Sequence, residues 1–157
     1  MKVSLIFTGK TTEKYLREGV DDYTERIRRY SSFEIICLPE LKHTRNMPVR
    51  EQKEKEGITI MRSLRNDDYV ILLDEKGIEY STSEFSAVYE RILMMARKRL
   101  VFIIGGAWGF SDGLYARADM KVSLSRMTFS HQTVRLLFLE QLYRICTIIK
   151  GDPYHHD

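Results

Sequence analysis

Apolar residues along the chain fall into short continuous runs, which are separated by longer stretches with helical periodicity. The runs have the length of strands, and the most apolar of them, 69–73 and 100–104, are typical of strands covered on both faces. The stretches between them place apolar side chains on one helical face. Because parallel neighbours need a crossover element between them, this alternation predicts an α/β fold. We expect a single domain over residues 1–157, with a mostly parallel sheet flanked by helices.

The expected strands and helices follow one another through the whole chain. The runs of strand length are residues 3–7, 33–38, 69–73, 100–104 and 121–124. Helices are expected over 11–29, 48–64, 81–95 and 131–150, with a further short helix after the glycines of 105–109. Pro48 suits a first helical residue, and Ser81 with Glu84 forms a capping-box pattern. The polar segment DEKG, residues 74–77, is typical of a turn.

The last expected helix, 131–150, is apolar on two opposite sides. One side carries Val134, Phe138, Leu142, Ile145 and Ile149, and the other carries Leu136, Leu139 and Tyr143. A helix with two apolar faces must be covered twice. In so small a chain the sheet covers one face, and we expect the same helix of a second subunit to cover the other. The pattern therefore predicts a twofold homodimer.

Composition narrows the class of protein without naming a partner. No apolar run approaches the roughly 20 residues that span a bilayer, so we expect a cytosolic protein. Cys37 and Cys146 lie in apolar stretches and are expected to be buried free thiols. A net charge of +3 permits a nucleic-acid partner but does not require one.

Basic residues gather in three places. The clusters at 26–29 and 97–99 end expected helices, where cations complement the helix dipole. The third cluster crowds one loop and has no such explanation; it consists of Lys42, His43, Arg45 and Arg50.

Two segments of the last third combine glycines and hydroxyls. FIIGGAWGF, residues 102–110, puts glycines directly after an apolar strand, where backbone can approach a ligand closely; a simple tight turn is an equal alternative. Its spacing matches neither GxGxxG nor a P-loop. SLSRMTFSHQ, residues 123–132, supplies hydroxyls ahead of a helix, and taken locally it indicates only a helix cap.

The tail GDPYHHD, which begins at Gly151, contains two adjacent histidines. Adjacent histidines with few other candidate ligands do not form a zinc site, so we expect no metal. Glycine and proline ahead of Tyr154 and His155 are expected to fold the tail back over the end of the last helix.

Taken together, FIIGGAWGF, LSRMTFSHQTVRLLFLEQLYR and GDPYHH resemble the signature of the ribosomal RNA large-subunit methyltransferase H family, the smallest members of the SPOUT class. The resemblance runs through the chain and includes KEGITI at 55–60 and LLDEKG at 72–77. It implies a C-terminal trefoil knot, which is a rare exception among folds. It also implies methylation of N3 of a pseudouridine in 23S ribosomal RNA, on the assembled ribosome, by a homodimer that uses S-adenosylmethionine.

The resemblance also implies roles for particular residues. S-adenosylmethionine would lie between the end of strand 69–73, the glycine turn and the loop before the last helix. The implied cofactor contacts are Leu73, Gly105, Gly106, Ser125, Arg126, Met127, Thr128, Phe129 and Ser130. His155 or Tyr154 would act near the target nitrogen, with Arg144 stabilising negative charge and Glu140 as a less favoured base. Phosphate contacts are expected from Arg135, Lys42, Arg45 and Arg50.

Two positions depart from the family pattern. Ser130 stands where the family commonly has proline, and Trp108 replaces a small or polar residue of the glycine turn, where it would contact cofactor or RNA. Two other interpretations remain: a knotted binding module without activity, and an unrelated flavodoxin-like or Rossmann-like regulator. The intact Arg144, Tyr154 and His155 argue against the first, and the last helix with its tail argues against the second.

Overall fold

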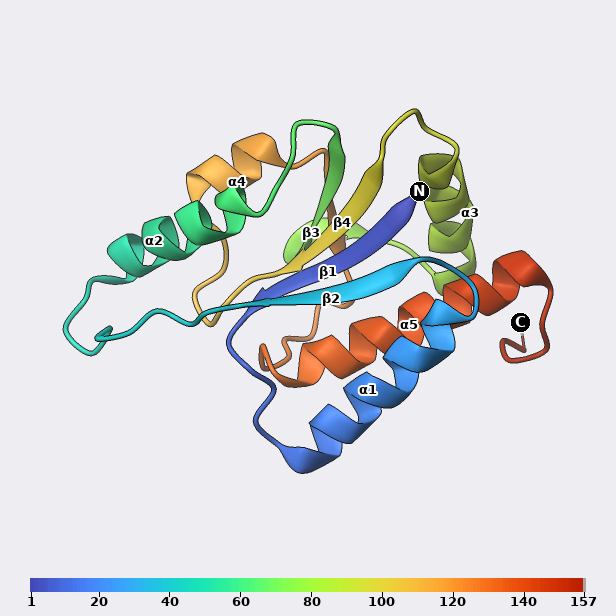
Figure 1. Ribbon diagram of the computed structural model, residues 1–157, viewed down its shortest axis with the longest axis horizontal. Coiled ribbons are helices and arrows are strands. Elements are labelled where there is room, and N and C mark those ends of the chain that lie inside the picture. The colour runs from blue at the N-terminus through green and yellow to red at the C-terminus, as the bar shows by residue number, and fades with distance from the viewer. Residues whose placement is uncertain (157) are drawn as a thin grey trace.

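Strands and helices alternate along the chain in the computed structural model, which describes residues 1–156 (Figure 1). The strands are β1 (Lys2–Thr8), β2 (Phe33–Leu38), β3 (Asp68–Glu79), β4 (Arg99–Ile104) and β5 (Met120–Ser123). The helices are α1 (Lys14–Arg28), α2 (Val49–Arg62), α3 (Thr82–Leu93), α4 (Asp112–Arg117) and α5 (Thr133–Lys150). The strands form one sheet in the order β2-β1-β4-β3-β5, and each pair of neighbours is parallel. The predicted α/β fold with a parallel sheet is confirmed.

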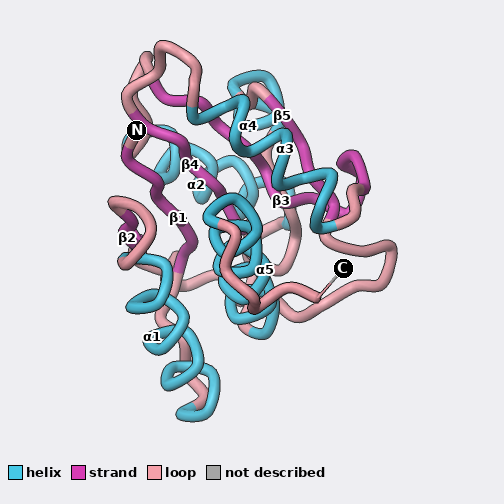
Figure 2. Tube along the Cα trace, turned by 90° about the vertical axis from the view of Figure 1, so that its right-hand side faces the viewer, coloured by secondary structure: helices cyan, strands magenta, loops and turns pink. Residues whose placement is uncertain are grey.

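Helices cover both faces of this sheet because successive strand side chains point to opposite sides. Leu5 and Phe102 belong to the core beneath α1, α3 and α5, whereas the adjacent Ile6 and Ile103 belong to the core beneath α2 and α4. Figure 2 shows α5 between α1 and α3, consistent with its contacts to both. The central strand β4 is buried over its whole length, which explains its continuous apolar sequence.

The second apolar face of α5 is covered by α1 of the same chain. A Cβ atom at Gly19 of α1 would lie only 2.8 Å from the Leu136 side chain, so the two helices pack closely. The rings of Tyr23 and Tyr143 continue this contact, with centroids 5.8 Å apart. The helix is therefore covered twice, as its pattern predicts, and α1 supplies cover on the face for which a second subunit is expected; the homodimer stays a prediction.

Strand β3 continues through the segment that the sequence indicates is a turn. Residues 71–73 pair with β5, and after a register shift Ile78 and Glu79 pair with the same strand. Gly77 lies at the shift, where an added Cβ would be 2.6 Å from the backbone of Lys121 and Val122. A glycine is needed here because the two backbones approach so closely.

The two free cysteines differ in exposure. Cys146 is buried on α5, as expected, whereas Cys37 is exposed on the edge strand β2. The Cys37 thiol donates to the Gly9 carbonyl at 3.3 Å. The expectation that both thiols are buried is therefore wrong for Cys37, because an edge strand has a neighbour on one side only.

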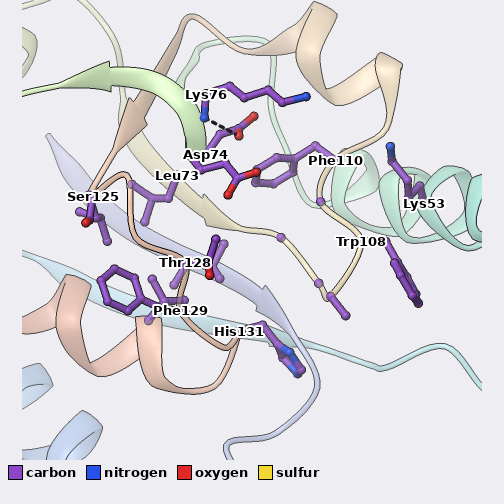
Figure 3. Close-up of a pocket in the computed structure, with 18 of the residues that line it drawn as sticks. Lys53, Leu73, Asp74, Lys76, Trp108, Phe110, Ser125, Thr128, Phe129 and His131 are labelled. Carbon is purple, nitrogen blue, oxygen red and sulfur yellow. Dashed lines mark hydrogen bonds between the residues drawn. The ribbon is translucent and has the colours of Figure 1, made fainter.

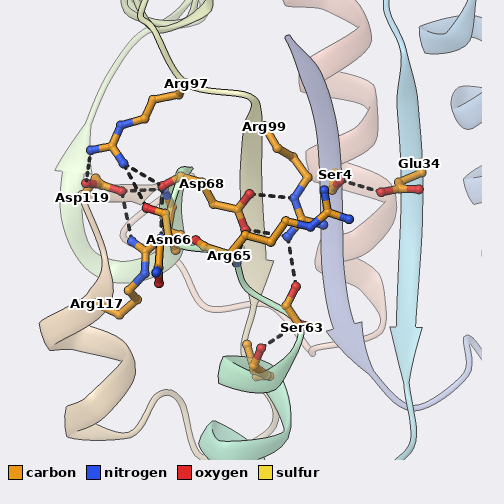
Figure 4. A network of polar contacts seen from close by, with 12 residues as sticks. Ser4, Glu34, Ser63, Arg65, Asn66, Asp68, Arg97, Arg99, Arg117 and Asp119 are labelled. Atoms are coloured by element: carbon orange, nitrogen blue, oxygen red, sulfur yellow. Dashed lines mark hydrogen bonds and ion pairs between the residues drawn. The ribbon is translucent and has the colours of Figure 1, made fainter.

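An ion network closes the edge of the sheet at which β3 and β4 begin (Figure 4). The Arg99 guanidinium donates to Asp68 Oδ1 at 2.9 Å, and the side chains of the pair are 5% and 0% exposed. The same guanidinium donates to the Ser63 carbonyl at 3.0 Å. Arg117 extends the network by donating to the Asp68 carbonyl at 3.1 Å. Arg99 therefore fixes the start of β4 rather than capping a helix.

Candidate active site

A cavity of about 490 Å³ opens at the other edge of the sheet, where β3 and β4 end (Figure 3). Ligands of open parallel sheets bind at this edge, and the volume is within the usual range for a small-molecule site. Three segments line the cavity: residues 73–76 in the middle of β3, the end of β4 with the loop to α4, and residues 124–134 before and within α5. Lys53 of α2 completes the wall.

One wall of the cavity is apolar. Leu73 of β3 pairs with Ile104 at the end of β4, and both line the cavity together with Val134 of α5 and Phe129 of the loop before it. That loop, 124–132, is shaped by its own hydroxyls: Ser125 Oγ accepts from the Met127 amide at 2.9 Å, and Ser130 Oγ accepts from the Thr133 amide at 3.1 Å. The hydroxyls predicted to cap the helix therefore also shape the cavity wall.

The opposite wall is a tight glycine turn. The Gly109 amide donates to the Gly106 carbonyl at 3.2 Å, and Gly109 has φ +84°, a conformation that side chains disfavour. Gly106 donates its amide to Glu56 Oε1 of α2 at 3.0 Å. A Cβ at Gly106 would lie 2.7 Å from the Glu56 carboxylate, so a larger residue here collides with Glu56.

Glu56 lies half-buried behind this turn. Desolvation raises the pKa of Glu56, the charge of Glu40 adds to that rise, and the hydrogen bond from Gly106 opposes it. A raised pKa means that the folded protein binds a proton more tightly than the unfolded chain does. The Glu56 carboxyl therefore lowers the free energy of unfolding as pH rises from about 4.3 through its folded pKa.

We expect the substitutions Glu56→Gln and Glu56→Ala to distinguish the effect of the Glu56 charge on stability from the effect of its hydrogen bond with Gly106. Glutamine keeps an acceptor for Gly106, so the stability of wild type relative to Glu56→Gln should fall between pH 4.5 and pH 7, as measured by urea unfolding. Alanine leaves the Gly106 amide without this acceptor and should cost about 1–3 kcal/mol at pH 7. If the difference in free energy of unfolding between wild type and Glu56→Gln did not change with pH, the raised pKa assigned to Glu56 would be contradicted.

A carboxylate and a phenol meet on the rim of the cavity. The Tyr115 hydroxyl donates to Asp74 Oδ2 at 2.5 Å, and the Lys76 amide donates to Asp74 Oδ1 at 3.0 Å. Burial and this hydrogen bond raise the pKa of Tyr115, so its phenol stays protonated and Asp74 stays a fixed acceptor. The rim therefore offers negative charge to a cationic part of a ligand.

The tail forms a second polar cluster around the later half of α5. Glycine at 151 has φ +80°, and the chain folds back there, as predicted. The Arg144 guanidinium donates to Glu140 Oε1 at 3.1 Å and lies 3.4 Å from His155 Nδ1. The Tyr154 hydroxyl lies 3.3 Å from both Glu140 Oε1 and the Tyr23 hydroxyl. The predicted catalytic residues are thus brought together.

The protonation state of the Tyr154 phenol decides which role it can have in the cluster. The hydrogen bond with Tyr23, burial and the Glu140 carboxylate raise the pKa of Tyr154 to about 12. A phenol with this pKa keeps its proton at neutral pH and serves as a donor rather than as a base.

The tail cluster and the cavity lie apart within one chain. Val134 lines the cavity, whereas Arg144 lies ten residues further along α5, about 15 Å along the helix axis. The lining of the cavity includes neither Arg144, Tyr154 nor His155. One chain therefore does not bring its own tail to its own cavity.

The remaining predicted site residues differ in their surroundings. Arg135 is 1% exposed, donates to the Thr8 and Gly9 carbonyls at 2.9 and 3.0 Å, and stacks on Phe7. Its expected contact with RNA phosphate is therefore wrong, because its donors are directed to the backbone. Lys42 and Arg45 are exposed in the loop, and Arg50 is exposed in the first turn of α2. Arg126 and Ser130 do not line the cavity.

The model of the family described as predicted SPOUT methyltransferase matches residues 1–155. The chain belongs to the SPOUT methyltransferase family. It is 46% identical to ribosomal RNA large subunit methyltransferase H of Parabacteroides distasonis and 48% identical to that of Phocaeicola vulgatus, over 100% of each chain. The crystal structure of a probable methyltransferase from Bordetella pertussis has the same fold, with a TM-score of 0.57 and 12% identity over 92% of this chain and 94% of that one.

The cavity of this SPOUT methyltransferase is also lined by residues that sequence reasoning missed. Lys53 stands in a charged stretch that predicts a solvent-exposed helix start, and Asp74 stands in the apparent turn DEKG. His131 lines the cavity although its sequence context indicates only a first-turn residue. Within residues 1–156 no cluster of His, Cys, Asp and Glu could hold a metal, and no helix in the same part is long and apolar enough to cross a membrane.

Proposed function

We propose that this methyltransferase transfers a methyl group from S-adenosylmethionine to N3 of a pseudouridine in 23S ribosomal RNA on the assembled ribosome. The observation that carries the proposal is identity of 46–48% over the full chain to proteins named ribosomal RNA large subunit methyltransferase H. The pseudouridine, its nitrogen and the assembled ribosome come from the resemblance of the sequence to that family. Such a substrate places the enzyme in the cytoplasm, and the trefoil knot of the family remains a prediction for this chain.

The cavity fits S-adenosylmethionine in size and chemistry. Its apolar wall of Leu73, Phe129 and Val134 suits an adenine, and the glycine turn offers backbone for hydrogen bonds. Asp74 on the rim suits the cationic amino acid part of the molecule. When bound, S-adenosylmethionine would supply the methyl group from its sulfonium.

We infer that the active site is completed by the tail of a second subunit. The cavity and the tail cluster are separated within one chain, so a twofold pair that exchanges tails would bring them together twice. Exposed apolar residues near the cavity support such a pair, since Met127, Phe129 and Leu137 are 77%, 43% and 38% exposed. The homodimer is thus proposed on a different ground from the apolar pattern of α5.

In this composite site, each tail residue has a different role. The imidazole of His155 accepts or orients the proton on N3 of the target base. Arg144 stabilises the negative charge that develops on the base as the proton leaves, while Glu140 holds the guanidinium in place. Tyr154, as a protonated phenol, donates a hydrogen bond that positions the substrate.

RNA binding is assigned to the loop residues Lys42 and Arg45, together with Arg50 in the first turn of α2. The loop precedes α2, whose Lys53 lines the cavity, so a phosphate backbone held there would reach the cavity mouth. Phosphate contacts of this kind supply much of the affinity of proteins for nucleic acid.

Deleting the gene should remove one N3-methylated pseudouridine from the large-subunit RNA of the host, as read by mass spectrometry of RNA fragments. Restoring wild type should return the modification, and His155→Ala should return at most about a hundredth of the wild-type rate. An unchanged modification map after deletion would refute the proposed function. Return of full activity by His155→Ala would refute only the role of His155.

A further inference from the structure

We propose that Trp108 is a stacking platform for a nucleobase of the RNA substrate and that Lys53 binds the adjoining phosphate, which together set where the RNA enters the site. The inference rests on the proposed function and adds a specificity determinant to it. It starts from an indole that is 57% exposed on the rim of the cavity. A large aromatic ring left in water on a cavity rim marks a binding surface.

The turn that carries Trp108 is held rigidly. Ala107 and Trp108 occupy the two corners of the turn closed by Gly106 and Gly109. Glu56 anchors the turn from α2 through the Gly106 amide, and Phe110 anchors its other end in the core with 3% exposure. The indole is therefore presented by a backbone that is ordered before any ligand binds, which lowers the entropy cost of binding.

The position of the indole favours RNA over the cofactor. In Figure 3, Trp108 is drawn beside α2, across the cavity from Leu73 and Phe129, which form the apolar wall suited to adenine. The methyl acceptor has to approach through the mouth of the cavity. A base next to the target nucleotide therefore meets the indole before it meets the apolar wall.

Lys53 supplies the charge that a nucleotide needs beside such a platform. Its side chain lies on the same side of the cavity as Trp108 in Figure 3, and it lines the cavity. Within residues 1–156 no salt bridge occupies Lys53, whereas Arg50 and Lys55 on the same helix pair with Glu54 and Glu51. An aromatic ring with an adjacent cation is the usual arrangement for holding unpaired nucleotides.

The chain contains a single tryptophan, so its intrinsic fluorescence reports on Trp108 alone. A uridine hexanucleotide should quench this emission by stacking, and S-adenosylmethionine without RNA should leave it nearly unchanged. Lys53→Ala should weaken the quenching by the hexanucleotide. Quenching by S-adenosylmethionine but not by RNA would overturn the inference, because the indole would then cover the cofactor.

Kinetics on assembled ribosomes that lack the modification give a second test. Trp108→Ala should raise the KM for these ribosomes about 10- to 100-fold, the loss expected from one stacked base, and should leave the S-adenosylmethionine Kd from calorimetry unchanged. Trp108→Phe should recover most of the affinity, and Met94→Ala, which removes a 77% exposed side chain away from the cavity, should change neither quantity.

Two kinetic results would overturn the inference: an unchanged KM for Trp108→Ala, or a Kd for S-adenosylmethionine that weakens as much as the KM rises. Failure of the wild-type enzyme to methylate assembled ribosomes that lack the modification contradicts the proposed function instead. In that event, quenching by the hexanucleotide supports the stacking role, and the absence of quenching overturns it.

Discussion

Mixing two inactive variants is expected to restore about a quarter of the wild-type activity, because random pairing makes half of the dimers mixed and each mixed dimer holds one intact site. One variant is His155→Ala, which lacks the proposed base. The other is Thr128→Trp, which places a large side chain at an exposed position of the cavity wall. Each variant alone should lose about a hundredfold or more in rate. Methyl transfer to assembled ribosomes that lack the modification, after the two variants are co-expressed, measures the recovery.

The same experiment distinguishes a composite site from a site within one chain. If each chain used its own tail, the mixture would stay as inactive as its parts. Calorimetry supplies the control, since Thr128→Trp should lose S-adenosylmethionine binding and His155→Ala should keep it. Retained binding by Thr128→Trp would show that the cavity is not the cofactor site.

Replacing Arg99 by methionine is expected to lower the free energy of unfolding by about 3–5 kcal/mol, because it leaves the Asp68 carboxylate buried without its partner. Burial raises the pKa of Asp68, but Arg99, the Arg65 amide and the charge of Arg117 outweigh that effect and hold the pKa below its ordinary value. The pair therefore stabilises the fold above about pH 3.9, and this contribution is lost as pH falls through the folded pKa. Urea unfolding at pH 7 measures the loss.

Lys98 provides the matched control for Arg99. It is the preceding residue, carries the same charge and pairs with Asp67 at 3.5 Å, but its side chain is 85% exposed. Lys98→Met should therefore lower the free energy of unfolding much less than Arg99→Met does. Adding Asp68→Asn to Arg99→Met should recover part of the stability, since it removes the unpaired charge. Equal effects of the two single substitutions would contradict the role given to the buried pair.

Much of the fold follows from local patterns in the sequence. Continuous apolar runs located each strand, and Ser81 with Glu84 forms the predicted capping box. These patterns do not show which element packs against which. The α5 sequence shows that two faces of the helix are covered. It does not show that α1, which packs closely at Gly19, covers the second face. For the same reason Cys37 in an apolar run is exposed, since edge position is a property of the whole sheet.

In the candidate site, too, some residues could be placed from local sequence patterns and others could not. The glycines after the apolar strand 100–104 could be placed at the cavity from the sequence, because ligands of parallel sheets bind at the carboxyl ends of the strands. The family resemblance added Leu73. Asp74 could not, since its polar neighbours are typical of a turn, although β3 continues through them. Arg135 shows the opposite error: its charge indicates a ligand contact, but carbonyls about 125 residues away in sequence bind its guanidinium.

The parallel sheet has a consequence for how the chain emerges from the ribosome that makes it. Strand β1 occupies a central position, yet its partner β4 begins only at Arg99, about a hundred residues later. At roughly 5 to 20 residues per second, one edge of β1 stays unpaired for about 5 to 20 seconds of synthesis. An apolar strand that waits this long is a target for chaperones and for aggregation. The nascent chain therefore depends on protection until its last third is translated.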